Sequence, residues 1–140
     1  MIIQMQNNDI NNVMKIWITE NLSAHKFIQK EYWLRNFDYV KSVINNSEVY
    51  VYKSENKICG FIGLEGDYIE GIFVDGNFQG RGIGKELLNF AKQIHNNLTL
   101  NVYEKNHGAV RFYKHEGFVI KSESVDIETG KKEYLMEWKR

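Results

Sequence analysis

The stretch Ile72–Lys85, which reads Ile-Phe-Val-Asp-Gly-Asn-Phe-Gln-Gly-Arg-Gly-Ile-Gly-Lys, constrains the fold of this chain more than any other segment. A β-branched and aromatic run enters a glycine-rich turn, and an apolar stripe with helical spacing begins at Ile83. Glycines let backbone N–H groups converge, and the first turn of a helix adds unpaired N–H groups and the positive end of its dipole. The segment therefore predicts a strand, an anion-binding loop and a helix, with charge from Arg81 and Lys85 suited to a pyrophosphate.

The spacing of the glycines excludes two other phosphate-binding loops. A P-loop has four residues between its first glycine and Gly-Lys, whereas three separate Gly80 from Gly84, and Glu86 stands where Ser or Thr is required. The dinucleotide fingerprint Gly-x-Gly-x-x-Gly also fails from both possible starts, because Lys85 or Leu87 occupies the place of its last glycine.

The remaining periodicities predict an α/β (α+β) chain with a mixed sheet, formed by one domain over residues 1–140. No repeat, low-complexity tract or flexible linker divides the sequence. The predicted order is β-α-α-β-β-β-α-β-α-β-β, with about four helices. The strands are expected at 1–6, 49–53, 58–64, 68–74, 98–103, 118–125 and 132–138, and the helices at 10–17, 33–44, 83–94 and 106–116.

The composition limits which binding partners and which cellular compartment are expected. Eighteen basic residues balance eighteen acidic ones, so electrostatics give no reason to expect binding to nucleic acid or to an anionic membrane. The single cysteine, Cys59, cannot form an intrachain disulfide, and no targeting or membrane-spanning segment is visible. These features predict a cytoplasmic protein. The histidines show no metal-ligand spacing, so no metal is expected.

Two separated motifs carry a resemblance to a known family. The segment Gln79–Gly84, Gln-Gly-Arg-Gly-Ile-Gly, is similar to the Gln/Arg-x-x-Gly-x-Gly/Ala signature of the GNAT N-acetyltransferase superfamily. The segment Asn106–Phe118, Asn-His-Gly-Ala-Val-Arg-Phe-Tyr-Lys-His-Glu-Gly-Phe, resembles the family's Asn-x-x-Ala-x-x-Phe-Tyr…Gly-Phe motif. The resemblance covers nearly the whole chain. The members that the chain resembles are small bacterial proteins with a single domain. Many members have proline where this chain has Gly76.

The resemblance implies the GNAT fold, with two splayed central strands, and acetyl-coenzyme A as cosubstrate. It implies transfer of an acetyl group to an amine by direct attack in a ternary complex. The loop would wrap the pyrophosphate, the pantetheine arm would pair with a strand edge, and a backbone N–H near Phe73–Val74 would face the thioester oxygen. The cofactor-binding residues that it implies are Ile72, Phe73, Val74, Gln79, Gly80, Arg81, Gly82, Ile83, Gly84, Lys85, Asn106 and Tyr113.

The resemblance also implies two catalytic residues. Tyr113 would be the general acid, although a tyrosine pKa near 10 and a thiol pKa near 8.5 favour a hydrogen bond to the departing sulfur, or a lowered tyrosine pKa, over simple proton transfer. Glu70, two residues before Ile72, is the candidate base, with Asp67, Glu65 or a water chain as weaker substitutes. The alternative interpretation is that Glu70 is a solvent-exposed strand residue without a catalytic role.

The acceptor site is expected near the first helices, where the resemblance places the wall of the pocket. His25, Phe27 and Tyr32 are the candidate substrate-binding residues, while Trp33 and Phe27 also suit a core. The sequence does not decide whether the acceptor is a peptide or protein lysine or a small-molecule amine. The chain is expected to be a monomer or homodimer. An acyl-coenzyme A sensor without turnover is the alternative function. A toxin that acetylates aminoacyl-tRNA is disfavoured by the balanced charge.

Overall fold

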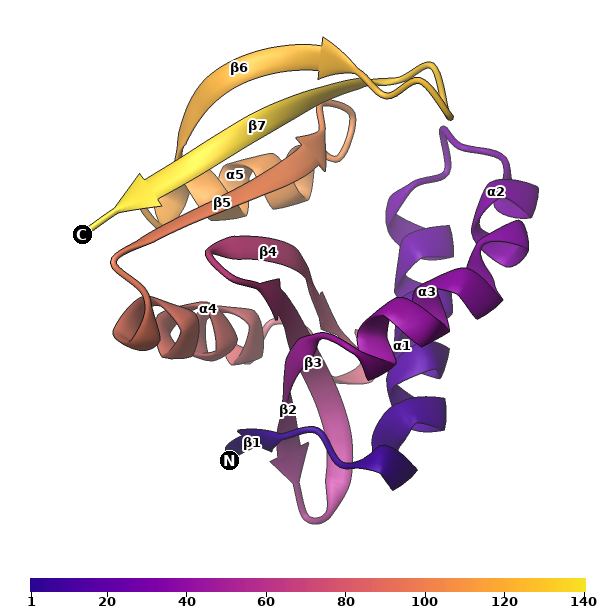
Figure 1. The fold of residues 1–140 in the computed structure, drawn as a ribbon, viewed down its shortest axis with the longest axis vertical. Coiled ribbons are helices and arrows are strands. Elements are labelled where there is room, and N and C mark those ends of the chain that lie inside the picture. Colours follow the sequence, from indigo (N-terminus) through magenta and orange to yellow (C-terminus); the bar gives the residue numbers. More distant parts are fainter.

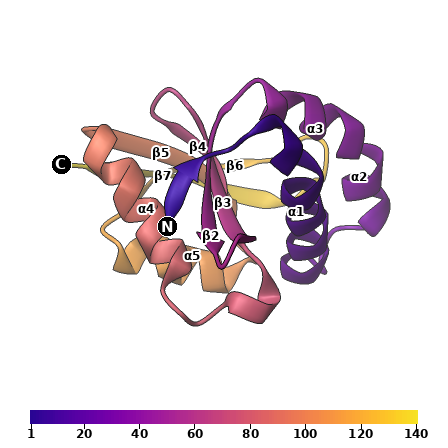
Figure 2. The ribbon, with the colours of Figure 1, turned by 90° about the horizontal axis from the view of Figure 1, so that it is seen from below.

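The computed structural model describes residues 1–140, and its helices cover both faces of one seven-stranded sheet (Figures 1 and 2). The strands are β1 (Ile2–Gln4), β2 (Glu48–Ser54), β3 (Lys57–Glu65), β4 (Tyr68–Val74), β5 (Asn97–Tyr103), β6 (Val119–Val125) and β7 (Lys132–Lys139), and the helices are α1 (Ile10–Ala24), α2 (Lys30–Arg35), α3 (Phe37–Asn45), α4 (Ile83–Ile94) and α5 (His107–His115). The predicted mixed α/β architecture is confirmed.

Five helices form where about four were predicted, because the second helical stretch divides at Asn36. The side-chain amide of Asn36 donates to the carbonyl of Tyr32 at 2.7 Å, and the backbone of Asn36 lies at φ −92° and ψ 0°. Asparagine bonds of this kind compete with the helical pattern. The apolar face survives the break, since Trp33 and Ile44 are both buried in the same cluster.

The two faces of the sheet bury separate apolar clusters. Side chains alternate between the faces along a strand, so that neighbouring residues of β3 enter different clusters: Phe61 packs toward α1–α3 and Ile62 toward α4 and α5. Figure 2 shows the three N-terminal helices on one side of the sheet and α4 and α5 on the other. No helix of the chain combines the length and apolar character that crossing a bilayer requires.

The strand order is β1-β2-β3-β4-β5-β7-β6, and only β4 and β5 run parallel. These two strands pair at one position alone, Tyr68 with Thr99, and then part (Figure 1). On either side of them the antiparallel pairing continues, from β3 to β4 over six partners and from β5 to β7 over seven. The splayed central strands that the resemblance implied are therefore present.

Local turns follow the sequence signals. Glu55 and Asn56 both have positive φ, 52° and 66°, which is the conformation of a tight hairpin turn between β2 and β3. Gly117, at φ 96°, lies just past the end of α5, in the left-handed conformation that is common for a glycine at this position.

Candidate active site

The open edge of β4 presents backbone groups where the two central strands part. The N–H of Asp75 donates to the carbonyl of Cys59 on β3 at 2.8 Å. Because successive residues of a strand point their backbone groups in opposite directions, the N–H of Val74 points away from β3, toward the open side. The carbonyl of Val74 also points away from β3, since it accepts a hydrogen bond from the side chain of Gln79 at 3.0 Å.

The loop after β4 has the backbone conformation that its glycines predicted. Gly80 and Gly82 have φ of 79° and 82°, in the left-handed region that favours glycine, and Gly82 immediately precedes α4. A Cβ at either position would meet no atom within 4 Å, so the space beside this backbone is open. Arg81 and Lys85 are exposed at the loop and the start of the helix. The loop, the helix terminus and the two cations suit a diphosphate.

Two of the predicted cofactor-binding residues of the loop have side chains that are engaged within the protein. Ile83 is 5% exposed and packs in the core, so only its backbone faces the loop. The Gln79 amide donates both to Val74 and to the carboxylate of Glu20, the latter at 2.8 Å. In this arrangement the Gln79 side chain holds the loop.

Glu20 of α1 is a loop anchor that the sequence analysis missed. Its second carboxylate oxygen accepts from the backbone N–H of Gly76 at 3.1 Å, so it bridges the helix to both ends of the turn. These partners lie 56 and 59 residues away along the chain, and no local pattern in the sequence marks the contact.

A cavity of about 220 Å³ lies where β4 and β5 part, closed on one side by α1 and α2. Most of its wall is aromatic or aliphatic, with a few polar side chains. Its lining residues are Trp17, Asn21, His25, Trp33, Glu70, Gly71, Ile72, Phe73, Asn101, Val102, Tyr103, Asn106, Ala109 and Tyr113. The cavity thus brings together the predicted Tyr113, Glu70, Asn106 and His25 from three separate parts of the chain: α5 with its N-cap, β4 and the end of α1.

Tyr113 is buried in this cavity, at 7% exposure, and packs edge to face against Phe112 and Phe118. Burial, and to a smaller extent the nearby Tyr68, raises the pKa of Tyr113 well above its usual value. The direction is opposite to the lowered pKa that the sequence analysis allowed. The hydroxyl therefore stays protonated and acts as a hydrogen-bond donor.

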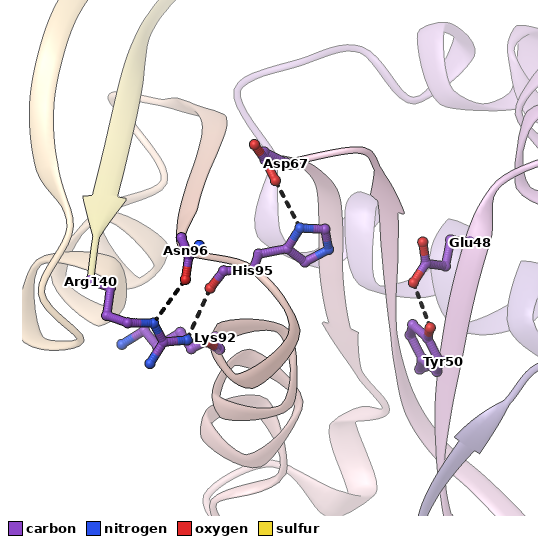
Figure 3. A network of polar contacts seen from close by, with 7 residues as sticks. All are labelled: Glu48, Tyr50, Asp67, Lys92, His95, Asn96 and Arg140. Carbon is purple, nitrogen blue, oxygen red and sulfur yellow. Dashed lines mark hydrogen bonds and ion pairs between the residues drawn. The ribbon is translucent and has the colours of Figure 1, made fainter.

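Glu70 of β4 places a carboxylate oxygen in the interior without a partner. Its Oε1 is buried and accepts no hydrogen bond, and the side chain lies over Gly63 of β3, where a Cβ would come within 3.5 Å of that oxygen. A buried polar atom without a partner is costly, and in a cavity-lining residue it makes Glu70 a candidate for a functional role. The substitutes Asp67 and Glu65 are exposed and line no part of this cavity. Asp67 instead contacts His95 at the far end of the sheet (Figure 3).

His25 lies across the cavity, at the end of α1. Its Nε2 is 3.2 Å from the side-chain amide nitrogen of Asn106, and its ring stacks on Trp33 with centroids 5.1 Å apart. Burial lowers the pKa of His25, and a contact with the Asn21 carbonyl partly offsets the effect. Asn106 caps α5 by accepting from the N–H of Ala109 at 3.3 Å.

Phe27 and Tyr32 line a neighbouring cavity of about 290 Å³, so they do not border the one that holds Tyr113. Phe27 nevertheless lies between the two cavities, since its ring packs against both His25 and Tyr103. The Tyr32 hydroxyl donates to Glu128 in the β6–β7 turn at 3.1 Å. Burial and this hydrogen bond raise the pKa of Tyr32 to about 12.

Together, the parted strands, the glycine loop and the cavity fit an extended cofactor with a diphosphate at one end and a reactive acyl group at the other. No three His, Cys, Asp or Glu side chains are grouped closely enough to hold a metal ion.

Comparisons with known proteins agree with this geometry. Residues 45–120 match the family described as "Acetyltransferase (GNAT) domain". The chain is 31% identical over 140 residues to the peptidyl-lysine N-acetyltransferase YiaC of Escherichia coli, covering 99% of this chain and 96% of that protein. The solution structure of apo YjaB from Escherichia coli superposes with a TM-score of 0.89, at 28% identity over 99% of this chain and 96% of that one.

A more distant structure supports the fold alone. The PaiA N-acetyltransferase of Thermoplasma acidophilum, solved in complex with coenzyme A, has a TM-score of 0.81 at 18% identity, over 100% of this chain and 98% of that one. The family match covers more than half of the chain, and the relative from Escherichia coli aligns over nearly all of it. The chain therefore belongs to the GNAT family and is an acetyl-coenzyme A-dependent N-acetyltransferase.

Proposed function

We propose that this enzyme acetylates the side-chain amine of lysine in a peptide or protein, with Glu70 and Tyr113 in the catalytic roles. Two Escherichia coli relatives that align over most of the chain, YiaC and YjaB, are named peptidyl-lysine N-acetyltransferases. The observation that carries the proposal is one cavity that is lined both by Glu70, a carboxylate with an oxygen that has no hydrogen-bond partner in the protein, and by Tyr113, a buried tyrosine whose raised pKa keeps it protonated.

Glu70 is suited to receive the proton of the incoming amine. A lysine ammonium has a pKa near 10.4, so only about one molecule in 2,500 is neutral at pH 7. A carboxylate with an unused oxygen first attracts the ammonium and then accepts a proton from it, directly or through water. The aromatic walls of Trp17, Trp33 and Tyr103 suit the alkyl chain and favour a cation near their faces.

The open edge of β4 is suited to stabilise the charge that develops on the acyl group. Acetyl-coenzyme A supplies a thioester, whose oxygen gains negative charge when the amine attacks. The N–H of Val74 points toward the side where the strands part, and a fixed backbone donor of this kind costs no reorganisation during the reaction.

Tyr113 is suited to the departing sulfur as a hydrogen-bond donor. Its raised pKa makes complete transfer of its proton to a thiolate unfavourable, because the thiol pKa lies near 8.5. A hydrogen bond from the hydroxyl still stabilises the sulfur as its charge grows. The leaving thiolate then takes its proton from solvent.

A coupled assay tests this function. The enzyme is incubated with acetyl-coenzyme A and a lysine-containing peptide, and both thiol release and the acetylated peptide are measured. Glu70→Gln is expected to lower kcat by about 10²- to 10³-fold, whereas Glu65→Gln, an exposed change on the preceding strand, keeps the wild-type rate. Binding of coenzyme A without turnover of any peptide or small amine would instead identify a sensor.

We also infer that the reaction takes place in the cytoplasm. The support is compositional: the only cysteine, Cys59, is buried on β3 and has no partner for a disulfide.

A further inference from the structure

A tyrosine at the end of β5 joins the cavity lined by Glu70 and Tyr113 (the acceptor cavity) to the turn between β6 and β7. The hydroxyl of Tyr103, which is also a lining residue of this cavity, donates to Oδ2 of Asp126 at 2.6 Å. Burial, and then this hydrogen bond, raises the pKa of Tyr103 above its usual value. The hydroxyl therefore stays protonated and remains a donor to the carboxylate.

Asp126 also organises the turn itself. Its Oδ2 accepts from the Thr129 hydroxyl at 3.1 Å, and its Oδ1 accepts from the backbone N–H of Glu128 at 3.1 Å. The backbone N–H of Asp126 donates to the carbonyl of Lys131 at 2.9 Å. One carboxylate thus couples the shape of the β6–β7 turn to the position of the Tyr103 hydroxyl.

A second tyrosine attaches the same turn to α2. The hydroxyl of Tyr32 donates to the carboxylate of Glu128 at 3.1 Å, across 96 residues of the chain. Figure 1 shows the turn beside the segment that links α1 and α2. The turn is therefore held from two directions, by β5 through Tyr103 and by α2 through Tyr32, which limits its freedom to move away from the cavity.

The ring of Tyr103 packs among the aromatic side chains at this end of the acceptor cavity. Its centroid lies 5.4 Å from that of His25 and 5.8 Å from that of Phe27, and both contacts are edge to face. The backbone of β5 holds the ring at Cβ, and the bond to Asp126 holds it at the opposite end, the hydroxyl. The bond therefore fixes where this wall of the cavity stands.

We propose that Asp126 is a positioning residue for the acceptor: through Tyr103 it fixes the wall against which the alkyl chain of the lysine packs. The inference rests on the proposed function, because it takes the acceptor amine to be bound beside Glu70. It assigns the β6–β7 turn to the binding of the acceptor, whereas the glycine loop after β4 binds the cofactor.

The test measures acetylation of Nα-acetyl-L-lysine methylamide by wild type, Tyr103→Phe, Asp126→Ala, Asp126→Asn and the double variant Tyr103→Phe/Asp126→Ala. Tyr103→Phe removes only the hydroxyl and leaves the bonds of Asp126 within the turn. Asparagine has the shape of aspartate, and a hydroxyl can donate to or accept from its amide, so Asp126→Asn keeps the contact. The control is Tyr134→Phe, since the Tyr134 hydroxyl bonds to Glu104 and neither residue lines the cavity.

Tyr103→Phe and Asp126→Ala should each raise the KM for the lysine derivative about three- to tenfold, which is the effect of one lost hydrogen bond. The kcat should stay near that of wild type, because a rise in KM alone reports lost binding. The double variant should be no worse than Asp126→Ala, since both changes break the same link. Asp126→Asn and Tyr134→Phe should stay close to wild type.

Two further measurements separate this effect from a general loss of structure. Calorimetry with coenzyme A should give the wild-type affinity for every variant, and thermal unfolding reports which variants are folded. Tyr103→Phe decides the proposal even if Asp126→Ala does not fold, because it leaves the turn intact.

Several results would overturn the proposal. A wild-type KM in Tyr103→Phe would show that the hydroxyl does not position the wall, and additive losses in the double variant would show that Asp126 acts separately from Tyr103. A loss of coenzyme A affinity equal to the loss for the acceptor would show a general structural role. If wild type acetylates the lysine derivative and Tyr103→Phe matches it, the transferase function stands and the inference falls; if wild type binds coenzyme A but acetylates no amine, both fall.

Discussion

The Asp67 carboxylate lies 2.8 Å from Nδ1 of His95 and joins the β3–β4 turn to the end of α4 (Figure 3). The backbone of the same aspartate accepts from the N–H of Thr99 on β5 at 3.0 Å. Next to it is the one paired position of β4 and β5, Tyr68 with Thr99. Asp67 thus fastens the closed end of the two strands whose other ends part around the active site.

Removal of this carboxylate should loosen the closed end. Asp67→Ala is expected to reduce the free energy of unfolding by about 1 kcal/mol or less, since the Asp67 side chain is exposed and its ion pair is screened by solvent. If Asp67 holds the two strands together, hydrogen exchange at the Thr99 amide, measured by NMR, should become faster in this variant. Glu65→Ala changes an exposed carboxylate close by on β3 and should leave that amide protected. Equal protection in the two variants would show that Asp67 does not hold the strands together.

Tyr113→Phe should lower kcat by about 10- to 100-fold while the Kd for coenzyme A stays near that of wild type. The substitution keeps the packing against Phe112 and Phe118 and removes only the hydroxyl that we assign to the sulfur. Tyr134→Phe is the matched control, because the Tyr134 hydroxyl bonds to Glu104 outside the cavity. Steady-state kinetics that give the same kcat for both variants would remove Tyr113 from the mechanism.

Gly82→Ala should weaken coenzyme A binding by about tenfold. The residue has φ 82°, where a Cβ costs about 1 kcal/mol, and any relaxation of the backbone redirects the N–H groups of the loop. Gly130→Ala introduces the same kind of strain, at φ 71°, in the β6–β7 turn. Calorimetry should find weaker binding for the first variant alone, and equal affinities would mean that the loop does not hold the cofactor.

Tyr50 should contribute to an alkaline loss of stability. Its hydrogen bond to Glu48, and then burial, raise the pKa of Tyr50 from 10.0 to about 12 (Figure 3). A raised pKa adds stability that is fully present below pH 10 and is lost as the pH rises toward 12, since the unfolded chain gives up the proton first. The stability difference between wild type and Tyr50→Phe, measured by urea unfolding, should shrink across this range. A constant difference would contradict the assignment.

Much of the cofactor-binding part of the site could be predicted, because the sequence patterns that specify it are local. The strand, the glycine turn and the helix are contiguous in sequence, and so are Asn106 and the helix that it caps. Their conformations follow from short-range sterics and hydrogen bonding. The resemblance then supplied the roles that spacing alone does not specify.

The acceptor side was harder because its contacts are distant in sequence. His25 meets Asn106 across 81 residues, and Glu20 reaches the loop across 56. Periodicity also does not reveal that Phe27 and Tyr32 line a second cavity, since Phe27 lies in the irregular segment between α1 and α2 and the cavity is completed by the distant residues Glu128, Thr129 and Lys131. The division of α2 from α3 depends on one asparagine bond, which competes closely with the helical pattern.

A structure of the enzyme bound to coenzyme A and a lysine-containing peptide would show whether the cofactor sulfur and the lysine amine meet between Tyr113 and Glu70. We expect the diphosphate on the backbone of residues 80–84, the sulfur within hydrogen-bond reach of the Tyr113 hydroxyl, and the lysine amine beside Glu70. A sulfur that lies away from Tyr113, or an amine that enters from another side of the sheet, would contradict it.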